Sequence, residues 1–593
     1  MEAADSPQGR DGAGQRRSPL DVLMSQIRRK RSDRKPLGRF LSWTSERTGT
    51  GTPEDEPDCR EETRPSPAPP EGERDVGWGR VCAFLQKLGK KADSRSLSLA
   101  HCDLTATDLL ELGTDTPESQ QQLRREEIQT LSFCSSASLL QSLPQLEEVD
   151  VSWNDLIGGS LMAITSHFQL VSGVRTLRLC GCRLDGEDVA ALGEGLGCTP
   201  LLEILDLSWN SGVGGGALQN LLGRLQPPLR ELHLVACQLT EADSSALGGM
   251  VATLPRLCVL DVSCNPQLVK DSNGAAFNQF AASLSQATPL TTLRLQACGL
   301  TADSLAALGT SLSSLPSLRE LDLSCNKHLS GGLSHLTFYL AHVAHLESLD
   351  LHLCALTRAD LEALIQVLPT LTALTQLDLS SNKEVGGVVH PLVSSLPLTQ
   401  MRRLPLNSCS LSQESFTALT LAVPHLRSVD VSWCKVVGGR LALLLDALQP
   451  SVIVELRLSS CQLSADDLHH LAAVCRRGSL SSLRVLDLSY NGSVADDGWS
   501  AVLAAGGLAS LEDLDLSLRP SASASCSAWL PVLIRALPQM PALTRLALQR
   551  WTATSQERRR LSHGTKNRAL LVEWDSDVTD STLQSSGHDT PEE

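Results

Sequence analysis

Aromatic residues are scarce in this chain of 593 residues, at 3%, although hydrophobic residues make up 42% of it. A large apolar content with few rings indicates a core built mainly from aliphatic side chains. No uninterrupted apolar run approaches the ~20 residues that a membrane-spanning helix needs. The formal net charge is −16, so general affinity for nucleic acid or for an anionic membrane surface is not expected.

Motifs that carry catalysis or hold cofactors are also missing. The chain has no GxxxxGK[ST] loop, no HExxH, no GxSxG and no GxGxxG that opens a helix. We therefore expect no enzyme activity, no cofactor and no metal. The first forty residues are rich in arginine and contain no apolar leader. The 18 cysteines are therefore expected to be reduced thiols in the cytoplasm or nucleus.

The chain repeats a pattern of leucines at intervals of about 28 residues. Within one unit, apolar residues occupy positions one, four, six and usually eleven, and asparagine or cysteine occupies position nine. Position nine is Asn154 in one unit and Cys182 in the next. It continues as Asn210, Cys237, Asn265, Cys298, Asn326, Cys354, Asn382, Cys409, Cys434, Cys461 and Asn491. About fifteen units follow one another.

Each unit predicts a short strand followed by a helix. Positions four and six point to the same side because side chains alternate along a strand. The second half, such as residues 301–318, repeats leucine at intervals of three and four, which predicts an amphipathic helix beginning at Thr301. One unit cannot bury its apolar face alone, so neighbours must stack. A buried asparagine at position nine is then expected to bond the backbones of adjacent turns, with cysteine as a small buried substitute.

Two unit types alternate along the array. Units of the form LRLxxCxLTxxDxxAL, as around Cys298, alternate with units of the form LDLSxNxxVGG, as around Asn210. This alternation resembles the ribonuclease-inhibitor subfamily of leucine-rich repeats from about Leu97 to Trp551. The resemblance implies an α/β solenoid, a leucine-rich-repeat horseshoe with a parallel β-sheet on the concave face and helices on the convex face. It also implies that the concave rim binds a protein.

The repeats divide the chain into four segments. Residues 1–77 lack the period, are basic and then acidic, and are expected to be a disordered arm. Residues 78–96 are expected to form an N-terminal capping helix, residues 97–556 the solenoid, and residues 557–593 a mobile acidic tail. Cys102 and Asn154 are 52 residues apart, and removing residues near 113–136 restores the usual interval. That stretch is expected to be an insertion, either a surface loop or a splice-variant segment.

Position five faces outward beside each strand and carries mostly aspartate and arginine. Adjacent strands lie about 4.8 Å apart, so most of these charges are expected to pair across the concave floor. Asp322, Asp350 and Asp378 have no basic residue in their part of the row. They predict an acidic strip that attracts a partner with a basic surface.

Position eight, at the exit of the strand, carries four aromatic residues: Trp153, Trp209, Trp433 and Tyr490. These rings either pad the turn between strand and helix or stand exposed as anchors for a partner. We list them as candidate binding residues because tryptophan and tyrosine dominate binding hot spots.

Two further features have alternative interpretations. Cys180 and Cys182 form a Cys-Gly-Cys pair, which we interpret as structural thiols rather than a metal site, with Cys182 buried and Cys180 facing outward. The basic run at Arg28, Arg29, Lys30 and Arg31 is either a nuclear-import signal or a solvated charge run. The chain is therefore interpreted as a protein-binding scaffold or inhibitor, or alternatively as a nuclear regulatory adaptor that uses this arm together with the solenoid. The identity of the partner is not readable from the sequence.

Overall fold

The structure is a computed structural model that describes residues 95–101, 104, 145–270, 274–566 and 568–575. The chain divides into two compact units, Met1–Gly89 and Lys90–Glu593, and all of the described residues belong to the second. The predicted arm at 1–77, with its basic run, lies outside the described residues. The insertion near 113–136 and residues 78–94 of the expected capping helix lie outside them as well.

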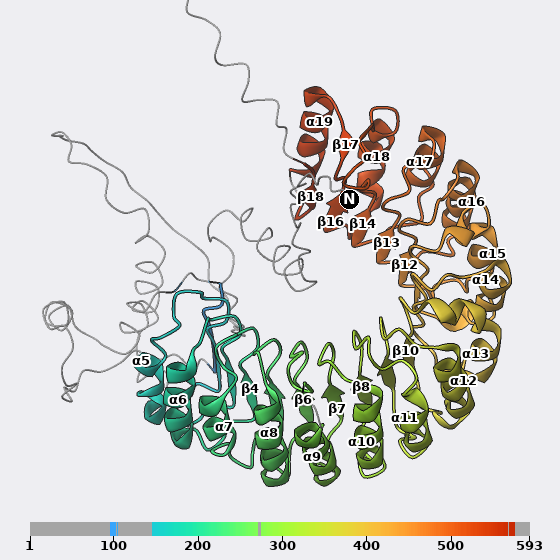
Figure 1. Cartoon of the computed structure of the whole chain (residues 1–593). Helices are drawn as coiled ribbons and strands as arrows, with labels where there is room; N and C mark the ends of the chain where they lie inside the picture. Colours follow the sequence, from blue (N-terminus) through green and yellow to red (C-terminus); the bar gives the residue numbers. More distant parts are fainter. Residues whose placement is uncertain (1–94, 102–103, 105–144, 271–273, 567, 576–593) are drawn as a thin grey trace, which may run out of the picture. The chain divides into compact units, whose positions relative to one another are not determined.

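Short parallel strands line the inner side of the second unit (Figure 1). Neighbouring strands align position four with position four, as in Leu177 with Leu205, so the buried leucines stack in one row. The strands are β1 (Ser96–Ser98), β2 (Glu148–Asp150), β3 (Thr176–Arg178), β4 (Ile204–Asp206), β5 (Glu231–His233), β6 (Val259–Asp261), β7 (Thr292–Arg294), β8 (Glu320–Asp322), β9 (Ser348–Asp350), β10 (Gln376–Asp378), β11 (Ser428–Asp430), β12 (Glu455–Arg457), β13 (Val485–Asp487), β14 (Asp513–Asp515), β16 (Arg545–Ala547) and β18 (Leu571–Glu573), with β15 (Ala524–Ser525) and β17 (Trp551–Thr552) paired separately.

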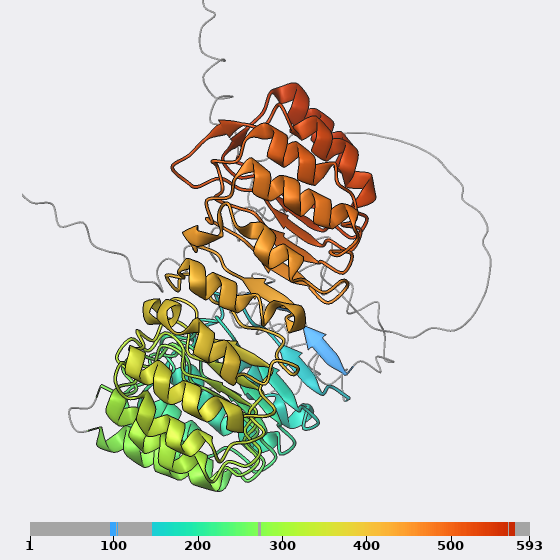
Figure 2. The same cartoon turned by 90° about the vertical axis from the view of Figure 1, so that its right-hand side faces the viewer.

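Helices cover the outer side, and Figure 2 shows those of the later repeats stacked in chain order. Helices pack 8–10 Å apart and strands about 4.8 Å apart, so the array must bend with its strands inside. The helices are α5 (Met162–Thr165), α6 (Gly186–Gly195), α7 (Gly216–Leu222), α8 (Glu241–Thr253), α9 (Ala275–Ser283), α10 (Ala302–Leu312), α11 (Leu333–Leu340), α12 (Arg358–Val367), α13 (Val389–Ser395), α14 (Gln413–Leu419), α15 (Leu441–Asp446), α16 (Ala465–Arg476), α17 (Asp496–Leu503), α18 (Leu530–Ala536) and α19 (Ser555–Thr565). Thr301 caps α10, and the predicted solenoid is confirmed.

The residues at position nine form the predicted ladder between neighbouring turns. Asn210 donates from Nδ2 to the carbonyl oxygens of Leu179 and Leu207, both at 2.8 Å. Its Oδ1 accepts from the amides of Cys182 at 2.9 Å and Leu184 at 3.1 Å. The asparagine of one unit thus satisfies the backbone of the cysteine unit before it. This arrangement explains why the two unit types alternate.

The parallel sheet on the inner side is interrupted at Pro405. β1 to β10 form one sheet, and β11 to β14, β16 and β18 form a second. The repeat between them contributes isolated pairings of Arg403 with Gln376 and Ser428, and single backbone hydrogen bonds such as that from the amide of Leu406 to the carbonyl oxygen of Asp430 at 3.0 Å. Proline has no amide hydrogen to donate to the neighbouring strand. Position nine is also irregular here, because Cys409 is followed by Cys434 rather than by an asparagine.

Buried tryptophans pack together near the C-terminal end of the array. Trp529 and Trp551 pack edge to face, with ring centroids 4.9 Å apart, and Trp499 packs against both. Trp551 donates from Nε1 to the carbonyl oxygen of Leu516 at 2.6 Å, as a ladder asparagine would. Beyond it, α19 and β18 continue the array, and β18 pairs with β16. The expected boundary at residue 556 is therefore wrong for residues 557–575, because the polar sequence of α19 conceals a helix that buries one residue, Leu561.

Candidate protein-binding face

Aspartates at position five hold the end of each strand. The amide of Ser324 donates to Asp322 Oδ1 at 2.9 Å, and the amide of His352 donates to Asp350 Oδ1 at 2.8 Å. Asp378 accepts from the amide of Ser380 at 2.9 Å in the same way. This local bond is typical of aspartate where the chain turns. An ionised carboxylate has about four acceptor positions, so each side chain keeps acceptor capacity for a partner.

Arginines at position five pair mainly with glutamates at position three, and this corrects the expectation that they pair with aspartates in their own row. Arg294 places Nε 2.8 Å from Glu320 Oε1 and Nη1 3.5 Å from Asp261 Oδ2. Arg178 pairs with Glu148. The sequence interpretation missed these glutamates, although positions three and five face the same side of a strand because side chains alternate.

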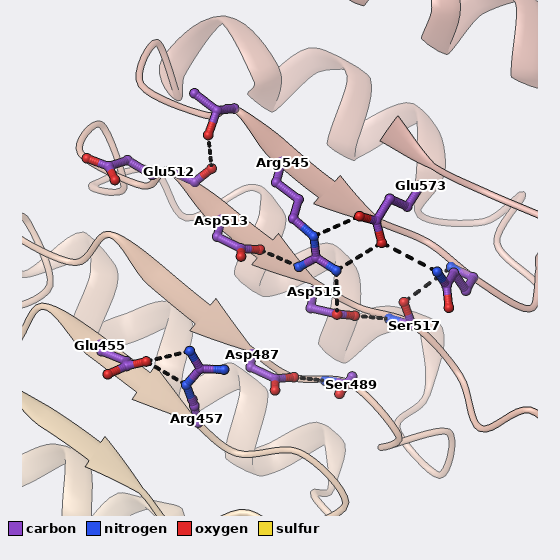
Figure 3. Close-up of polar contacts among 12 residues, drawn as sticks. Glu455, Arg457, Asp487, Ser489, Glu512, Asp513, Asp515, Ser517, Arg545 and Glu573 are labelled. Atoms are coloured by element: carbon purple, nitrogen blue, oxygen red, sulfur yellow. Dashed lines mark hydrogen bonds and ion pairs between the residues drawn. The ribbon is translucent and has the colours of Figure 1, made fainter. Parts of the chain in front are cut away.

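The second sheet carries a dense charge network on its inner face (Figure 3). Arg545 lies among three carboxylates, 2.8 Å from Asp513 Oδ1, 3.4 Å from Asp515 Oδ2 and 3.0 Å from Glu573 Oε2. Arg457 pairs with Glu455 at 2.5 Å. These arginines are satisfied within the chain, so this region is less suited than an unpaired one to attract a charged partner.

The acidic strip on β8, β9 and β10 has no such direct pairing, although Arg294 and Arg403 lie close enough for their charges to act on Asp322 and Asp350. The register places Asp322 beside Asp350 and Asp350 beside Asp378. Within the described residues, no ion pair joins any of the three to a basic side chain. Burial, followed by the charge of Asp378, raises the pKa of Asp350 to about 7. Burial also raises the pKa of Asp322. The strip is therefore a group of like charges, and a cationic partner would reduce the repulsion among them.

Trp153 and Trp209 belong to an aromatic cluster in the early repeats. Trp153 stacks on His101 with ring centroids 6.0 Å apart, and its centroid is 6.4 Å from that of Trp209. Gly181 lies in the unit between them, and a Cβ there would meet Cε3 of Trp153 at 2.5 Å. Only glycine at position 181 leaves room for the ring of Trp153. The placement of this ring therefore depends on Gly181.

Trp433 and Tyr490 form a second cluster in the later repeats. Their ring centroids lie 6.0 Å apart, nearly edge to face. Arg519 lies over Trp433, with Cζ 5.5 Å from the ring centroid, and donates to Ser460 Oγ at 2.5 Å. Trp433 remains 51% exposed, whereas the ring of Tyr490 is partly buried. The rings thus pack against one another at the turn, and Trp433 is the most accessible of the predicted anchors.

One aromatic cluster lies in the repeats before the acidic strip and the other lies in the repeats after it. Both clusters belong to position eight, whereas the strip belongs to position five. All four aromatic residues have φ between 62° and 65°, in the left-handed region that is uncommon outside glycine. Between the clusters the same position carries smaller residues: Ala236, Cys264, Ala297, Cys325, Leu353, Ser381 and Ser408. The structure therefore places the predicted binding residues on one face, in three separate groups.

The cysteines and histidines of the described residues form no metal site, since no group of three potential ligands comes together there. Cys182 is fully buried, and Cys180, expected to face outward, is only 9% exposed. Burial raises the pKa of the Cys182 thiol to about 12, so it is a poor nucleophile at neutral pH. His470 pairs with Asp446 at 2.9 Å on the outer face. No helix of the described residues has the length and apolar character to cross a bilayer.

Comparison with known proteins agrees with this architecture. Residues 314–331 and 479–503 match the family described as Leucine Rich repeat. Ribonuclease inhibitor of Sus scrofa is 30% identical over 373 residues, which span 61% of this chain and 80% of that protein. NACHT, LRR and PYD domains-containing protein 12 of Homo sapiens is 32% identical over 248 residues, or 41% of this chain and 23% of that protein. The crystal structure of the yeast Rad7 and Elc1 complex aligns at 15% identity with a TM-score of 0.43, covering 70% of this chain and 92% of the matched chain.

The match to the pig protein spans 80% of the length of that protein at 30% identity. The chain belongs to the ribonuclease inhibitor family of leucine-rich-repeat proteins.

Proposed function

We propose that this chain is a non-enzymatic scaffold or inhibitor that binds a basic protein on the inner face of its repeat array. The observation that carries the proposal is the unpaired strip of Asp322, Asp350 and Asp378 on adjacent strands. A cationic surface would lower the repulsion among these carboxylates and gain charge-assisted hydrogen bonds. Trp433 and the other position-eight rings supply anchors beside the strip.

The relatives suggest a first partner to test. The pig and mouse relatives are named ribonuclease inhibitor, and a basic ribonuclease has the charge that the strip favours. We therefore propose a pancreatic-type ribonuclease as the first probe of the inner face. The proposal of a basic partner does not depend on that choice, because it rests on the charge of the strip.

The test compares two triple variants that each replace three carboxylates with amides, and it is run at pH 8, above the pKa of about 7 of Asp350. The first carries Asp322→Asn, Asp350→Asn and Asp378→Asn on the inner face, and asparagine keeps the acceptor that holds each strand end. The control carries Glu194→Gln, Glu241→Gln and Asp303→Asn at exposed positions on outer helices. Binding of ribonuclease, and of proteins captured from a cytosolic extract, is measured by surface plasmon resonance.

We expect the inner-face variant to bind at least tenfold more weakly and the control to stay within about twofold, because a charge pair at a partly buried site contributes about 1.4 kcal/mol or more. Equal loss in both variants would mean that net charge alone matters, and the inner-face proposal would then fail. If ribonuclease does not bind the wild-type chain, the captured proteins decide the outcome.

A nuclear regulatory adaptor is the second candidate, favoured by the basic run at Arg28, Arg29, Lys30 and Arg31. On this proposal the arm directs import and the solenoid contributes the partner-binding face, with cytoplasm and nucleus as the two compartments. Imaging of a chain without residues 1–40 tests it. A nuclear fraction that is unchanged by the deletion would exclude the import role.

A further inference from the structure

Two serines of the described residues follow a pair of arginines in the same way. Arg476 and Arg477 lie three and two residues before Ser479, and Arg559 and Arg560 lie three and two residues before Ser562. Kinases that prefer basic substrates hold such arginines with acidic side chains. Both serines therefore have arginines at the two positions that such a kinase selects, but their surroundings in the fold differ.

Ser479 is fixed in the array. It follows the end of α16, and its amide donates to the carbonyl oxygen of Val474 at 3.3 Å. Leu480, the next residue, is fully buried at 0% exposure. Arg477 pairs with Asp446 at 3.3 Å. A kinase needs an extended substrate, so it would have to draw Leu480 out of the core to reach this serine.

Ser562 lies on a helix that is weakly held. α19 is the last helix of the described array, and it packs against one other helix, α18. Leu561 is its only buried residue, whereas Arg559, Arg560 and Ser562 are exposed. The helix ends three residues after Ser562, at Thr565. Local opening is easiest at helix ends with few buried apolar contacts, so this stretch can extend at small cost.

We propose that Ser562 is a phosphorylation site for a basophilic serine/threonine kinase, and that Ser479 is not a site in the folded chain. In the reaction, Ser562 Oγ attacks the γ-phosphorus of ATP and a new O–P bond forms. The bond between the γ-phosphorus and the β–γ bridging oxygen breaks, and ADP leaves. The hydroxyl proton passes to the catalytic aspartate of the kinase.

The phosphate would act on the contacts of α19. It would lie in the last turn of the helix, where negative charge is unfavourable to the helix dipole. It would also lie four residues from Arg558, whose Cζ is 5.0 Å from the ring centroid of Trp574 and whose Nη1 donates to the carbonyl oxygen of Asp575 at 3.3 Å. Competition for Arg558 would loosen the contact between α19 and the residues after β18.

The test treats the full chain with ATP and the catalytic subunit of cAMP-dependent protein kinase, with phosphosites mapped by mass spectrometry. Site mapping separates Ser562 and Ser479 from other serines that follow arginines. We expect Ser562 to be modified at least tenfold faster than Ser479. Ser562→Ala should remove this phosphopeptide, and Ser479→Ala should leave it unchanged.

Synthetic peptides spanning each serine are the matched control, since both lack the fold. We expect the kinase to modify the two peptides at rates within about threefold of each other. Modification of Ser479 in the folded chain as fast as Ser562, or an unmodified Ser562 beside a modified Ser562 peptide, would overturn the proposal. Hydrogen exchange across residues 555–566 should become faster after phosphorylation, which provides a second measurement on the same sample.

Discussion

At the scale of single residues, the aspartates of position five combine a structural and an electrostatic role. Each one accepts the amide two residues later, as Asp350 does from His352. Burying three such groups on adjacent strands is unfavourable when all are charged. A chain that only needed the turn could use asparagine, which offers the same acceptor. The retained charges therefore favour a role in binding.

The raised pKa of Asp350 predicts how its stability contribution depends on pH. The pKa is about 7 in the folded chain, above that of an unfolded aspartate, so the folded state binds more protons between pH 4 and 7. Stability therefore falls as pH rises through that window and stays lower above it. We expect Asp350→Asn to stabilise the chain by about 1–2 kcal/mol above pH 7, and by little at pH 4.

Urea unfolding of wild type and Asp350→Asn between pH 4 and 8 measures the difference. Asp303→Asn, at an exposed position on α10, is the control and should show no such trend. A difference between Asp350→Asn and wild type that does not grow with pH would contradict the account of the strip.

The ladder predicts a large cost for losing one buried asparagine. Asn210→Ala removes bonds to the backbone atoms of Leu179, Leu207, Cys182 and Leu184. Buried groups left without partners cost about 1–3 kcal/mol each, and not all contribute fully. We expect a loss of roughly 3–5 kcal/mol in urea unfolding. Asn220→Ala, at an exposed position on α7, should change stability by less than about 0.5 kcal/mol; similar effects of the two would refute the ladder's role.

At the scale of elements, the inner sheet is divided at the repeat around Pro405. Pro405 occupies a position where other strands donate an amide, and the sheet divides there. On the outer side of the same repeat, a shallow hollow opens beside α13 and α14, lined in part by His390, Thr417 and Leu421. In a repeat array each unit is held mainly by its neighbours, so we expect the missing strand hydrogen bond to weaken the coupling between the repeats on either side.

Restoring the missing amide should join the two sheets. We expect Pro405→Ser to donate a hydrogen bond to the neighbouring strand and to stabilise the chain by about 1 kcal/mol. Hydrogen exchange at the new amide should be slow. Pro289→Ser, placed before β7 rather than within it, should give a rapidly exchanging amide. Rapid exchange at residue 405 would show that the junction has another cause.

Elements were predictable from the sequence where one residue type repeats a simple role. Leucines at positions four and six determine the strands, and Asn210 and Cys182 in the ladder follow from the same spacing. Pro405 is visible in the sequence, but the break in the sheet was not predicted from it. The units on either side follow the regular spacing, and that spacing predicts a strand here too. α19 was missed because the end of an array buries little, and Leu561 gives no periodic signal.

The binding face was predictable only in part. The position-five row shows no basic residue beside Asp350, and this was predictable because register is uniform. Arg403, whose charge acts on Asp350, lies in another row. Arg294 and Arg457, at position five, reach glutamates at position three. The spacing of the repeat does not show how far these side chains reach. His101 and Arg519 join the aromatic clusters through contacts across units, which no local pattern indicates.

At the scale of the whole molecule, the second unit presents an inner face with an acidic strip between two aromatic clusters. Arginines elsewhere on this face, such as Arg545, are already paired within the chain. On β8, β9 and β10, three aspartates without an ion pair lie beside one another on successive strands. A basic partner would find both its electrostatic attraction and its anchors on the strand side of the array.

Carboxylate footprinting of the chain with and without its bound partner tests this claim most directly. The complex is treated with a carbodiimide and an amine, and labelling of each aspartate and glutamate is measured by mass spectrometry. We predict that labelling of Asp322, Asp350 and Asp378 falls at least threefold on binding, while labelling of the outer-face Glu194 and Glu241 is unchanged. Protection of the outer-face residues, with the strip labelled as in the free chain, would contradict the account.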